Sequence, residues 1–160
     1  MRVILAYGKE GLEIELPDKG VTVLEPRYTP GVPDERAVLQ RAMRQPMGTP
    51  PLRELVSPQD TVAIVFSDLT RPMPNDRVLP VLLDELDHVP REKITLINAL
   101  GTHRRNTDEE LKDMLGREIA AGYRVIQHDC WDKKGMVYLG QTSFGHEAWV
   151  SRAYLEADVR

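Results

Sequence analysis

The sequence predicts an α/β fold in which a mainly parallel sheet is flanked by helices. Two continuous apolar runs rich in β-branched residues, TVAIVF (61–66) and KITLINALG (93–101), have the composition of strands buried on both faces. Segments with helical spacing follow each run, so strand and helix alternate along the chain. Right-handed crossovers then place the helices against the sheet. The predicted arrangement is a Rossmann-like layered fold, preceded by an N-terminal β-hairpin.

The start of the chain is rich in β-forming residues. RVILAY (2–7) and the alternating LEIEL (12–16) are separated by a short connection with two glycines, a pattern typical of a hairpin. We interpret VTVLEP (21–26) as a third short strand. Two prolines and a glycine predict a loop over 27–34, and Asp34 is placed to cap the modest amphipathic helix that follows.

The alternating part of the chain begins near residue 60. After the first buried strand, apolar residues at helical spacing predict a helix over 76–86, in which Pro80 is tolerable only near the first turn. After the second buried strand, Thr107 and Glu110 match a capping box that begins another helix. These elements form a βαβ series.

The remaining elements are shorter. Gly116 is a natural stop for the capped helix. Further strands are predicted at 123–129, 136–142 and 146–150. The proline-rich stretch before the βαβ series has room for one helical turn, at 52–55. We assign 1–160 to one domain, with a β-rich start at 1–26 and a βαβ core at about 60–160.

Composition and charge exclude several classes of partner. The net charge of -4 argues against nucleic acid and anionic membranes, since both call for a basic face. The single Cys130 excludes an internal disulfide and fits a reducing cytosol. No apolar run reaches the roughly 18–20 residues of a membrane span, and none fits a signal peptide. We expect a cytoplasmic protein that binds neither nucleic acid nor membrane.

Polar clusters follow three of the predicted strands at the point where each strand ends. SDLTR follows TVAIVF, GTHRRNT follows the second buried strand, and HDCWD follows the strand at 123–129. In open α/β sheets, ligands bind beyond the carboxyl ends of the strands. This convergence is the main functional signal in the sequence.

The first cluster, SDLTRPMPN (67–75), allows two interpretations. Arg71 supplies a planar fork suited to a carboxylate or phosphate, and the helix start that follows favours an anion as well. Alternatively, Asp68 and Arg71 pair with each other, while Ser67 or Asn75 caps the turn.

The second cluster, GTHRRNT, contains a candidate acid or base. His103 follows Gly101, where a glycine lets the backbone approach a ligand, and histidine titrates near neutral pH. The alternative is a solvent-facing loop histidine beside two solvated arginines.

The third cluster, His128-Asp129-Cys130, contains residue types that bind metals. Adjacent residues rarely bind one ion together, and no HxH, HExxH or CxxC pattern is present. A strand-end histidine held by a neighbouring carboxylate is the simpler interpretation. We assign no metal ligand in this chain.

These clusters together resemble a known family. SDLTRPMPN, ALGTHRRNT with its trailing TDEEL, and QHD before a lysine-rich turn are similar to the N-terminal domain of the nickel-dependent lactate racemase family (LarA-like proteins), in order over about residues 27–160. The resemblance implies an isomerase that inverts a small 2-hydroxy acid by hydride transfer, with a nickel-pincer nucleotide as cofactor. It also implies that Arg71, with Thr70, holds the substrate carboxylate, that His103 is one of two proton-transferring histidines, and that Asp68 orients the site.

The resemblance also implies a missing partner. In the family, the lysine that tethers the cofactor and the second catalytic histidine follow in a glycine-rich stretch, and no segment of this sequence matches that stretch. We therefore expect half of an active site, completed by a C-terminal domain, and no racemisation by the isolated chain. Two alternatives stay open: a non-catalytic anion- or nucleotide-binding domain, and a structural α/β module whose polar loops face another domain.

Overall fold

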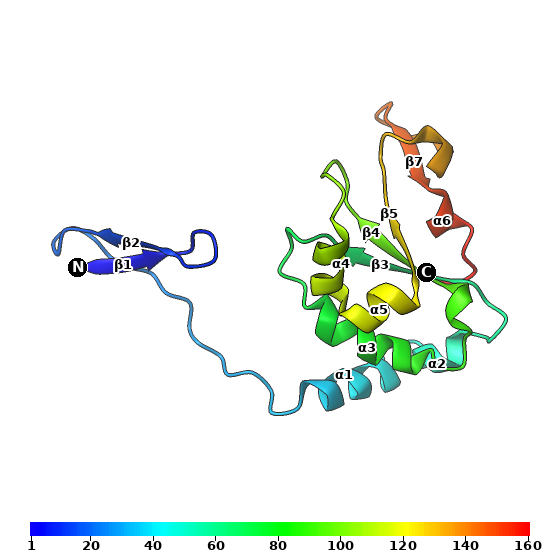
Figure 1. Ribbon diagram of the computed structural model, residues 1–160, viewed down its shortest axis with the longest axis horizontal. Coiled ribbons are helices and arrows are strands. Elements are labelled where there is room, and N and C mark those ends of the chain that lie inside the picture. Colours follow the sequence, from blue (N-terminus) through cyan, green and yellow to red (C-terminus); the bar gives the residue numbers. More distant parts are fainter. The chain divides into compact units, whose positions relative to one another are not determined.

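The computed structural model describes all residues, 1–160, and the chain divides into two compact units, Met1–Val32 and Pro33–Arg160. In the first unit, β1 (Arg2–Leu5) pairs with β2 (Leu12–Glu15) as the predicted antiparallel hairpin (Figure 1). Residues 21–26 form no strand, contrary to our interpretation. β-propensity alone does not make a strand, because a strand needs a partner for its backbone hydrogen bonds.

The second unit is built on a parallel sheet with the strand order β3-β4-β5. Its strands are β3 (Val62–Ser67), β4 (Ile94–Ala99) and β5 (Arg124–Gln127). The connections between them carry α3 (Asn75–Glu85), a 3-10 turn η1 (Arg91–Lys93), α4 (Asp108–Leu115) and α5 (Arg117–Gly122). This is the βαβ series that the sequence predicts.

Helices cover both faces of the sheet, as Figure 1 shows. On one face, buried side chains of the strands such as Phe66 and Leu96 pack against apolar residues of α3 and α4, including Leu83 and Leu115. On the other face, a smaller cluster forms around Ala63 and Ile97 with α6 (Arg152–Leu155) and the residues after it. The side chains of a strand alternate between the two faces, which explains the two clusters. The predicted fold class is confirmed.

Two helices before the sheet pack beside α3. The helix α1 (Glu35–Arg44) begins as predicted at Asp34, whose Oδ1 accepts a hydrogen bond from the Ala37 N–H at 2.9 Å. The short α2 (Leu52–Leu55) is the predicted single turn. Arg44 joins α1 to α3, because its Nε donates to the buried Glu85 carboxylate at 2.9 Å.

The structure adds one helix to the sequence prediction. Gly116 ends α4 at a positive φ of 82°, as predicted, but it also begins α5, which the sequence prediction missed.

The helix α3 begins at Asn75, so Pro80 falls close to its first turn, as the sequence prediction requires. Pro80 removes one helical hydrogen bond, because proline has no N–H, and its ring crowds the carbonyl of the preceding turn.

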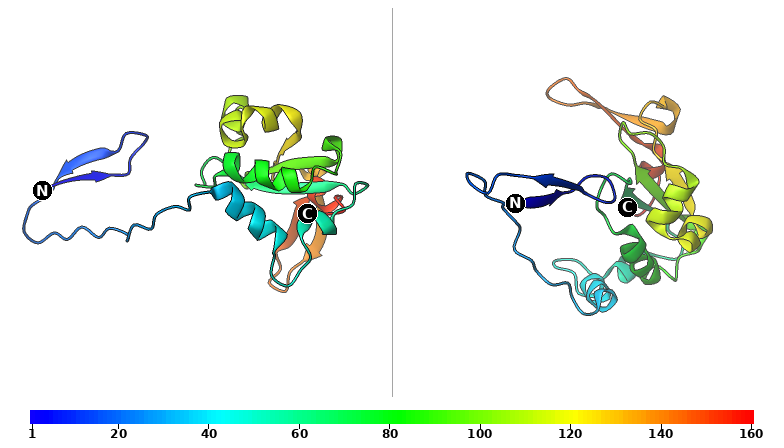
Figure 2. Two further views of the ribbon diagram at one scale, coloured as in Figure 1. Left: turned by 90° about the horizontal axis from the view of Figure 1, so that it is seen from below. Right: turned by 60° about the vertical axis from the view of Figure 1, so that its left-hand side comes forward.

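A second hairpin follows β5. It consists of β6 (Met136–Gln141) and β7 (Glu147–Ser151), which pair antiparallel after a 3-10 turn η2 (Lys133–Gly135). This hairpin, orange in Figure 2, projects from the three-stranded sheet as a two-stranded arm. None of the helices combines the length and apolar character needed to cross a membrane.

Candidate active site

The loops that carry the polar clusters leave the sheet side by side. Ser67 at the end of β3 lies opposite Ala99 at the end of β4, and Asn98 lies opposite Gln127 at the end of β5. The carboxyl ends of parallel strands meet at one edge of a sheet, which is where such folds bind ligands. Asp68 and Leu100 are therefore the first residues of two neighbouring loops.

These two loops enclose a cleft of about 240 Å³. Its lining comes from the end of β3 and β4 and the residues directly after them: Ser67, Asp68, Arg71, Ala99, Leu100, Gly101, Thr102 and His103. The structure thus brings together Asp68, Arg71 and His103 around one small space. Thr70 is not part of this lining, but its hydroxyl donates a hydrogen bond to the Asp68 carboxylate, which is.

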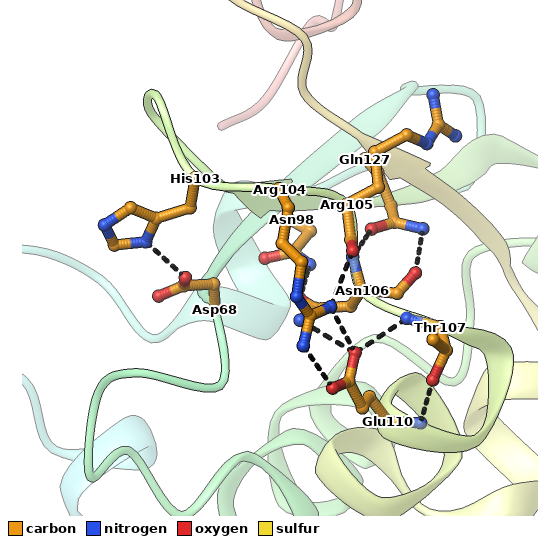
Figure 3. Close-up of polar contacts among 9 residues, drawn as sticks. All are labelled: Asp68, Asn98, His103, Arg104, Arg105, Asn106, Thr107, Glu110 and Gln127. Atoms are coloured by element: carbon orange, nitrogen blue, oxygen red, sulfur yellow. Dashed lines mark hydrogen bonds and ion pairs between the residues drawn. The ribbon is translucent and has the colours of Figure 1, made fainter.

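Asp68 and His103 form the central contact of the cleft (Figure 3). Nδ1 of His103 lies 2.6 Å from Oδ2 of Asp68, and the Thr70 hydroxyl donates to Oδ1 at 2.8 Å. The Asp68 side chain is 5% exposed, whereas that of His103 is 48% exposed. The His103 bond, aided by Thr70 and opposed by burial, lowers the pKa of Asp68. The carboxyl is therefore ionised at neutral pH.

This pair orients the histidine ring. An ionised carboxylate only accepts hydrogen bonds, so the proton of neutral His103 lies on Nδ1, facing Asp68. The lone pair of the His103 ring is then on Nε2, the nitrogen that does not face Asp68, and the side chain as a whole is half-exposed. A carboxylate that fixes the tautomer of a histidine is the arrangement that general bases require. His103 can take a proton through Nε2.

Arg71 supplies the positive charge of the cleft. Asp68 is bonded by His103 and Thr70 rather than by the guanidinium of Arg71, so the alternative in which Asp68 and Arg71 neutralise each other is not what the structure shows. Arg71 is exposed, and only its backbone N–H contacts Asp68, donating to the carbonyl oxygen at 3.1 Å. Its planar fork is left to bind a carboxylate.

Local turn chemistry holds both loops. The Asn75 side chain at the start of α3 donates to the Ser67 carbonyl oxygen at 3.4 Å, which ties the first loop closed. In the second loop, the His103 N–H donates to the Leu100 carbonyl oxygen at 3.0 Å. Gly101 lies within that turn at a φ of 59°, a conformation that a side chain would strain. The stretch SDLTRPMPN thus forms a turn, and its residues Ser67, Asp68 and Arg71 line the cleft.

The sequence prediction missed three amides that support the second loop. Figure 3 shows hydrogen bonds that link Asn106 to both Asn98 and Gln127, at the end of the loop that carries His103. One signal was present: Asn98 is a polar residue within an otherwise apolar strand, ITLINAL. Buried polar residues in strands need partners, but the sequence does not say which.

The third cluster lines an adjoining cleft. His128, Asp129 and Cys130 line a space of about 360 Å³ together with the loop that carries His103, so His103 borders both spaces. No group of three or more His, Cys, Asp or Glu side chains is arranged to hold a metal ion. The His128 backbone N–H donates to the Asn98 carbonyl oxygen at 3.1 Å. No contact shows the neighbouring carboxylate that we expected beside its ring.

The protein is thus a parallel α/β domain in which a histidine, a carboxylate and an arginine line one cleft beyond the ends of two neighbouring strands. The profile of one family, described as "Lactate racemase N-terminal domain", matches residues 7–160. The chain belongs to this family. The resemblance that its motifs predict is thereby confirmed.

Two curated relatives agree with this assignment. The chain is 29% identical to a lactate racemase of Thermoanaerobacterium thermosaccharolyticum over 160 residues, which cover 97% of this chain and 37% of that protein. It is 32% identical to a lactate racemase of Lactiplantibacillus plantarum over 126 residues, which cover 78% of this chain and 30% of that protein. The matched regions thus span 37% and 30% of the length of these relatives, about a third of each.

Solved structures show the same fold. The lactate racemase apoprotein from T. thermosaccharolyticum superposes with a TM-score of 0.76 at 28% identity, over 99% of this chain and 38% of that chain. A protein from Thermotoga maritima superposes with a TM-score of 0.55 at 23% identity, over 72% of this chain and 26% of that chain. The second likeness concerns the fold alone.

Proposed function

We propose that this chain is the N-terminal part of a 2-hydroxy-acid racemase or epimerase of the lactate type, working by hydride abstraction and return with proton transfer by histidine. The single observation that carries the proposal is the cleft in which Arg71, His103 and Asp68 come together. Its volume of about 240 Å³ suits a small substrate. Its lining provides one cation and one base, and a 2-hydroxy acid offers a carboxylate and a hydroxyl to match them.

Each residue has a defined role in this proposal. Arg71 binds the substrate carboxylate through its guanidinium, with Thr70 beside it. His103 takes the hydroxyl proton on Nε2 when the hydroxyl-bearing carbon of one enantiomer is oxidised, and returns it when that enantiomer forms again. The second histidine serves the other enantiomer, which forms when hydride returns to the opposite face. Asp68 is ionised and stabilises the imidazolium that forms, as the 2.6 Å contact to Nδ1 allows. Arg71 and His103 are the catalytic contacts, and Asp68 acts through His103.

The nickel-pincer nucleotide is part of the proposal for the larger protein. When bound, such a cofactor supplies a hydride acceptor. The residues of this chain do not fit as its metal ligands, because no suitable group of three side chains exists and the one histidine of the cleft is bonded to Asp68. We therefore propose that the metal ligands, the tethering lysine and the second histidine come from a further domain. The greater length of the relatives supports this proposal.

A ligand titration tests the substrate-binding part of the proposal. Lactate is added to the chain while the side-chain NMR resonances of Arg71 and His103 are followed. We expect saturable shifts of both residues in the wild type, and loss of the His103 shifts in Arg71→Gln. Arg117→Gln is the matched control, since Arg117 is an exposed arginine at the start of α5, outside the cleft lining. Shifts that survive Arg71→Gln contradict the proposal. Tighter binding of inorganic phosphate or a nucleotide than of lactate favours the anion-binding alternative.

An activity measurement tests the proton-transfer part. The isolated chain with lactate and cofactor is expected to show no racemisation. In a protein that joins this chain to the remaining domain of a lactate racemase, His103→Gln lowers kcat by roughly 10²–10⁴-fold, the range of a lost acid-base group, and changes KM far less. Racemisation by the isolated chain, or a joined protein indifferent to His103→Gln, counts against the proposed roles.

A further inference from the structure

The loop that carries His103 is held at its far end by an amide pairing. Asn106, 5% exposed, donates its backbone N–H to Oε1 of Gln127 at 2.6 Å, and its carbonyl oxygen accepts from Nε2 of Gln127 at 2.9 Å. Both backbone groups of one residue are thus bonded by one side chain of β5, in the way that a neighbouring strand would bond them. Figure 3 shows the two parallel contacts.

A second contact ties the same residue to the next strand. Oδ1 of Asn106 accepts a hydrogen bond from Nδ2 of Asn98 at 2.7 Å, and Asn98 is fully buried on β4. The Asn98 Oδ1 atom has no hydrogen-bond partner in the protein. The bond that Nδ2 donates to Asn106 is therefore the one hydrogen bond of the Asn98 side chain. Asn106 is therefore bonded to two adjacent strands, through its backbone to β5 and through its side chain to β4.

Ion pairing closes the loop onto α4. Arg104 donates to both carboxylate oxygens of Glu110, at 2.6 and 2.9 Å, and the Thr107 N–H donates to the same carboxylate at 2.8 Å. The Arg104 side-chain bond, aided by the Thr107 backbone bond, lowers the pKa of Glu110 to about 2. These contacts lie on the surface, whereas the contact of Asn106 with Asn98 is buried and those with Gln127 are part-buried, so the amides provide the firmer anchor.

Between its two anchored ends the loop has no core contacts of its own. Residues 101–105 are all exposed, and the chain is bonded to the sheet at Leu100 and at Asn106. The position of His103 relative to Asp68 is therefore set by these ends and by the 2.6 Å contact itself. Freeing one end adds conformational freedom that the contact with Asp68 must overcome.

We propose that Asn106 and Gln127 are positioning residues for His103, fixing through their paired amides where its ring lies against Asp68. The proposal rests on the proposed function for its consequence in catalysis, but the positioning itself needs no substrate. It extends the site to β5, which contributes no residue to the lining of the 240 Å³ cleft.

The test compares two glutamine variants of the chain without any ligand. Gln127→Leu removes both contacts to Asn106 at nearly constant volume. Gln141→Leu is the matched control, because Gln141 also donates to a backbone carbonyl oxygen, that of Gly145 at 2.9 Å, but in the β6–β7 hairpin. The measured quantities are the Asp68 carboxyl titration by ¹³C NMR and the ring ¹⁵N shifts of His103. The titratable and charged groups at this cleft are Asp68, His103 and Arg71, and neither variant substitutes any of them.

We expect Gln127→Leu to raise the proton affinity of Asp68 roughly three- to tenfold, as its bond from His103 weakens, and Gln141→Leu to leave it unchanged. The His103 ring shifts move with it, which a purely structural loss elsewhere does not produce. An Asp68 titration identical to wild type in folded Gln127→Leu overturns the proposal.

A milder variant covers the case in which Gln127→Leu does not fold. Gln127→Asn keeps an uncharged amide but is one methylene shorter, which weakens both contacts to Asn106 without adding a charge, so a change in the same direction is expected. If Gln127→Asn folds and leaves Asp68 and His103 unaffected, the proposal is overturned as well. Failure of lactate to bind the wild type contradicts the proposed function instead, since the glutamine comparison contains no lactate.

Discussion

The ionised Asp68 beside His103 makes the substitution Asp68→Asn the most informative perturbation of the cleft. The two residues are nearly equal in size, so the change removes charge and leaves volume. Asparagine can keep both contacts in neutral form: its Oδ1 can face Nδ1–H of His103, and its Nδ2 can donate to the Thr70 hydroxyl, which accepts as well as donates. The variant therefore loses only the charge assistance of the pair.

The size of that loss follows from the geometry. Hydrogen bonds to charged groups contribute about 1.5–3 kcal/mol and neutral ones about 0.5–1.5 kcal/mol. The His103 side chain is 48% exposed, which screens the pair and places the difference at the low end. We expect Asp68→Asn to lower the free energy of unfolding by about 1 kcal/mol at neutral pH.

The pH dependence gives this prediction its sign. The folded-state pKa of Asp68 is lowered, so the unfolded state binds the proton more readily. The stabilising effect is fully present above the unfolded pKa of about 3.9 and is lost as the pH falls through the lower folded value. The stability difference between wild type and Asp68→Asn should therefore shrink as the pH falls below the unfolded pKa of about 3.9.

Urea unfolding at pH 7, 5 and 3.5 measures this difference. Asp87→Asn is the control, because the Asp87 carboxylate is 64% exposed in its pair with Arg53, and exposed pairs contribute little. Equal stability of Asp68→Asn and wild type at pH 7, or a difference that persists unchanged to pH 3.5, would refute the reasoning.

Two further predictions concern the scaffold of the site. Leu96→Ala removes a fully buried side chain from the centre of β4 and should lower the free energy of unfolding by about 2–5 kcal/mol in urea, whereas Val65→Ala at a half-exposed position should cost far less; equal costs would contradict the placement of the core. Glu110→Gln removes the carboxylate that Arg104 and the Thr107 N–H share, so amide exchange at Thr107 should become faster. Because the pKa of Glu110 is lowered to about 2, wild-type protection at Thr107 should persist as the pH falls below the usual carboxyl range and be lost only as it approaches about 2. Loss near pH 4.5, the ordinary value, would speak against the pairing.

The parts of the fold that depend on local pattern were predicted well. The apolar runs of β3 and β4, the helical spacing of α3 and the capping box of α4 appear where the sequence places them. The errors fall where local pattern is not decisive. Residues 21–26 have the composition of a strand but form none. Gly116 ends α4, and no local signal indicates that α5 begins directly after it.

The candidate site was predictable in its residues but not in its contacts. The sequence alone determines that Asp68, Arg71 and His103 follow two adjacent strands, because strand ends are marked by the change from apolar to polar residues. Only the tertiary structure decides that Asp68 pairs with His103 rather than with Arg71. Which partner a carboxylate chooses depends on the register Ser67–Ala99 between the strands, and residues 35 positions apart carry no local signal of it.

The same reason applies to the amides beneath the loop. Asn98 stands out as a polar residue in an apolar strand, but nothing in the spacing of Asn98, Asn106 and Gln127 indicates that they meet. They meet because β4 and β5 are paired with Asn98 opposite Gln127, and because the loop returns Asn106 above both. Hydrophobic pattern and turn chemistry are local and can be read along a chain. Hydrogen-bond partners are chosen across the sheet, after the strands have taken their places.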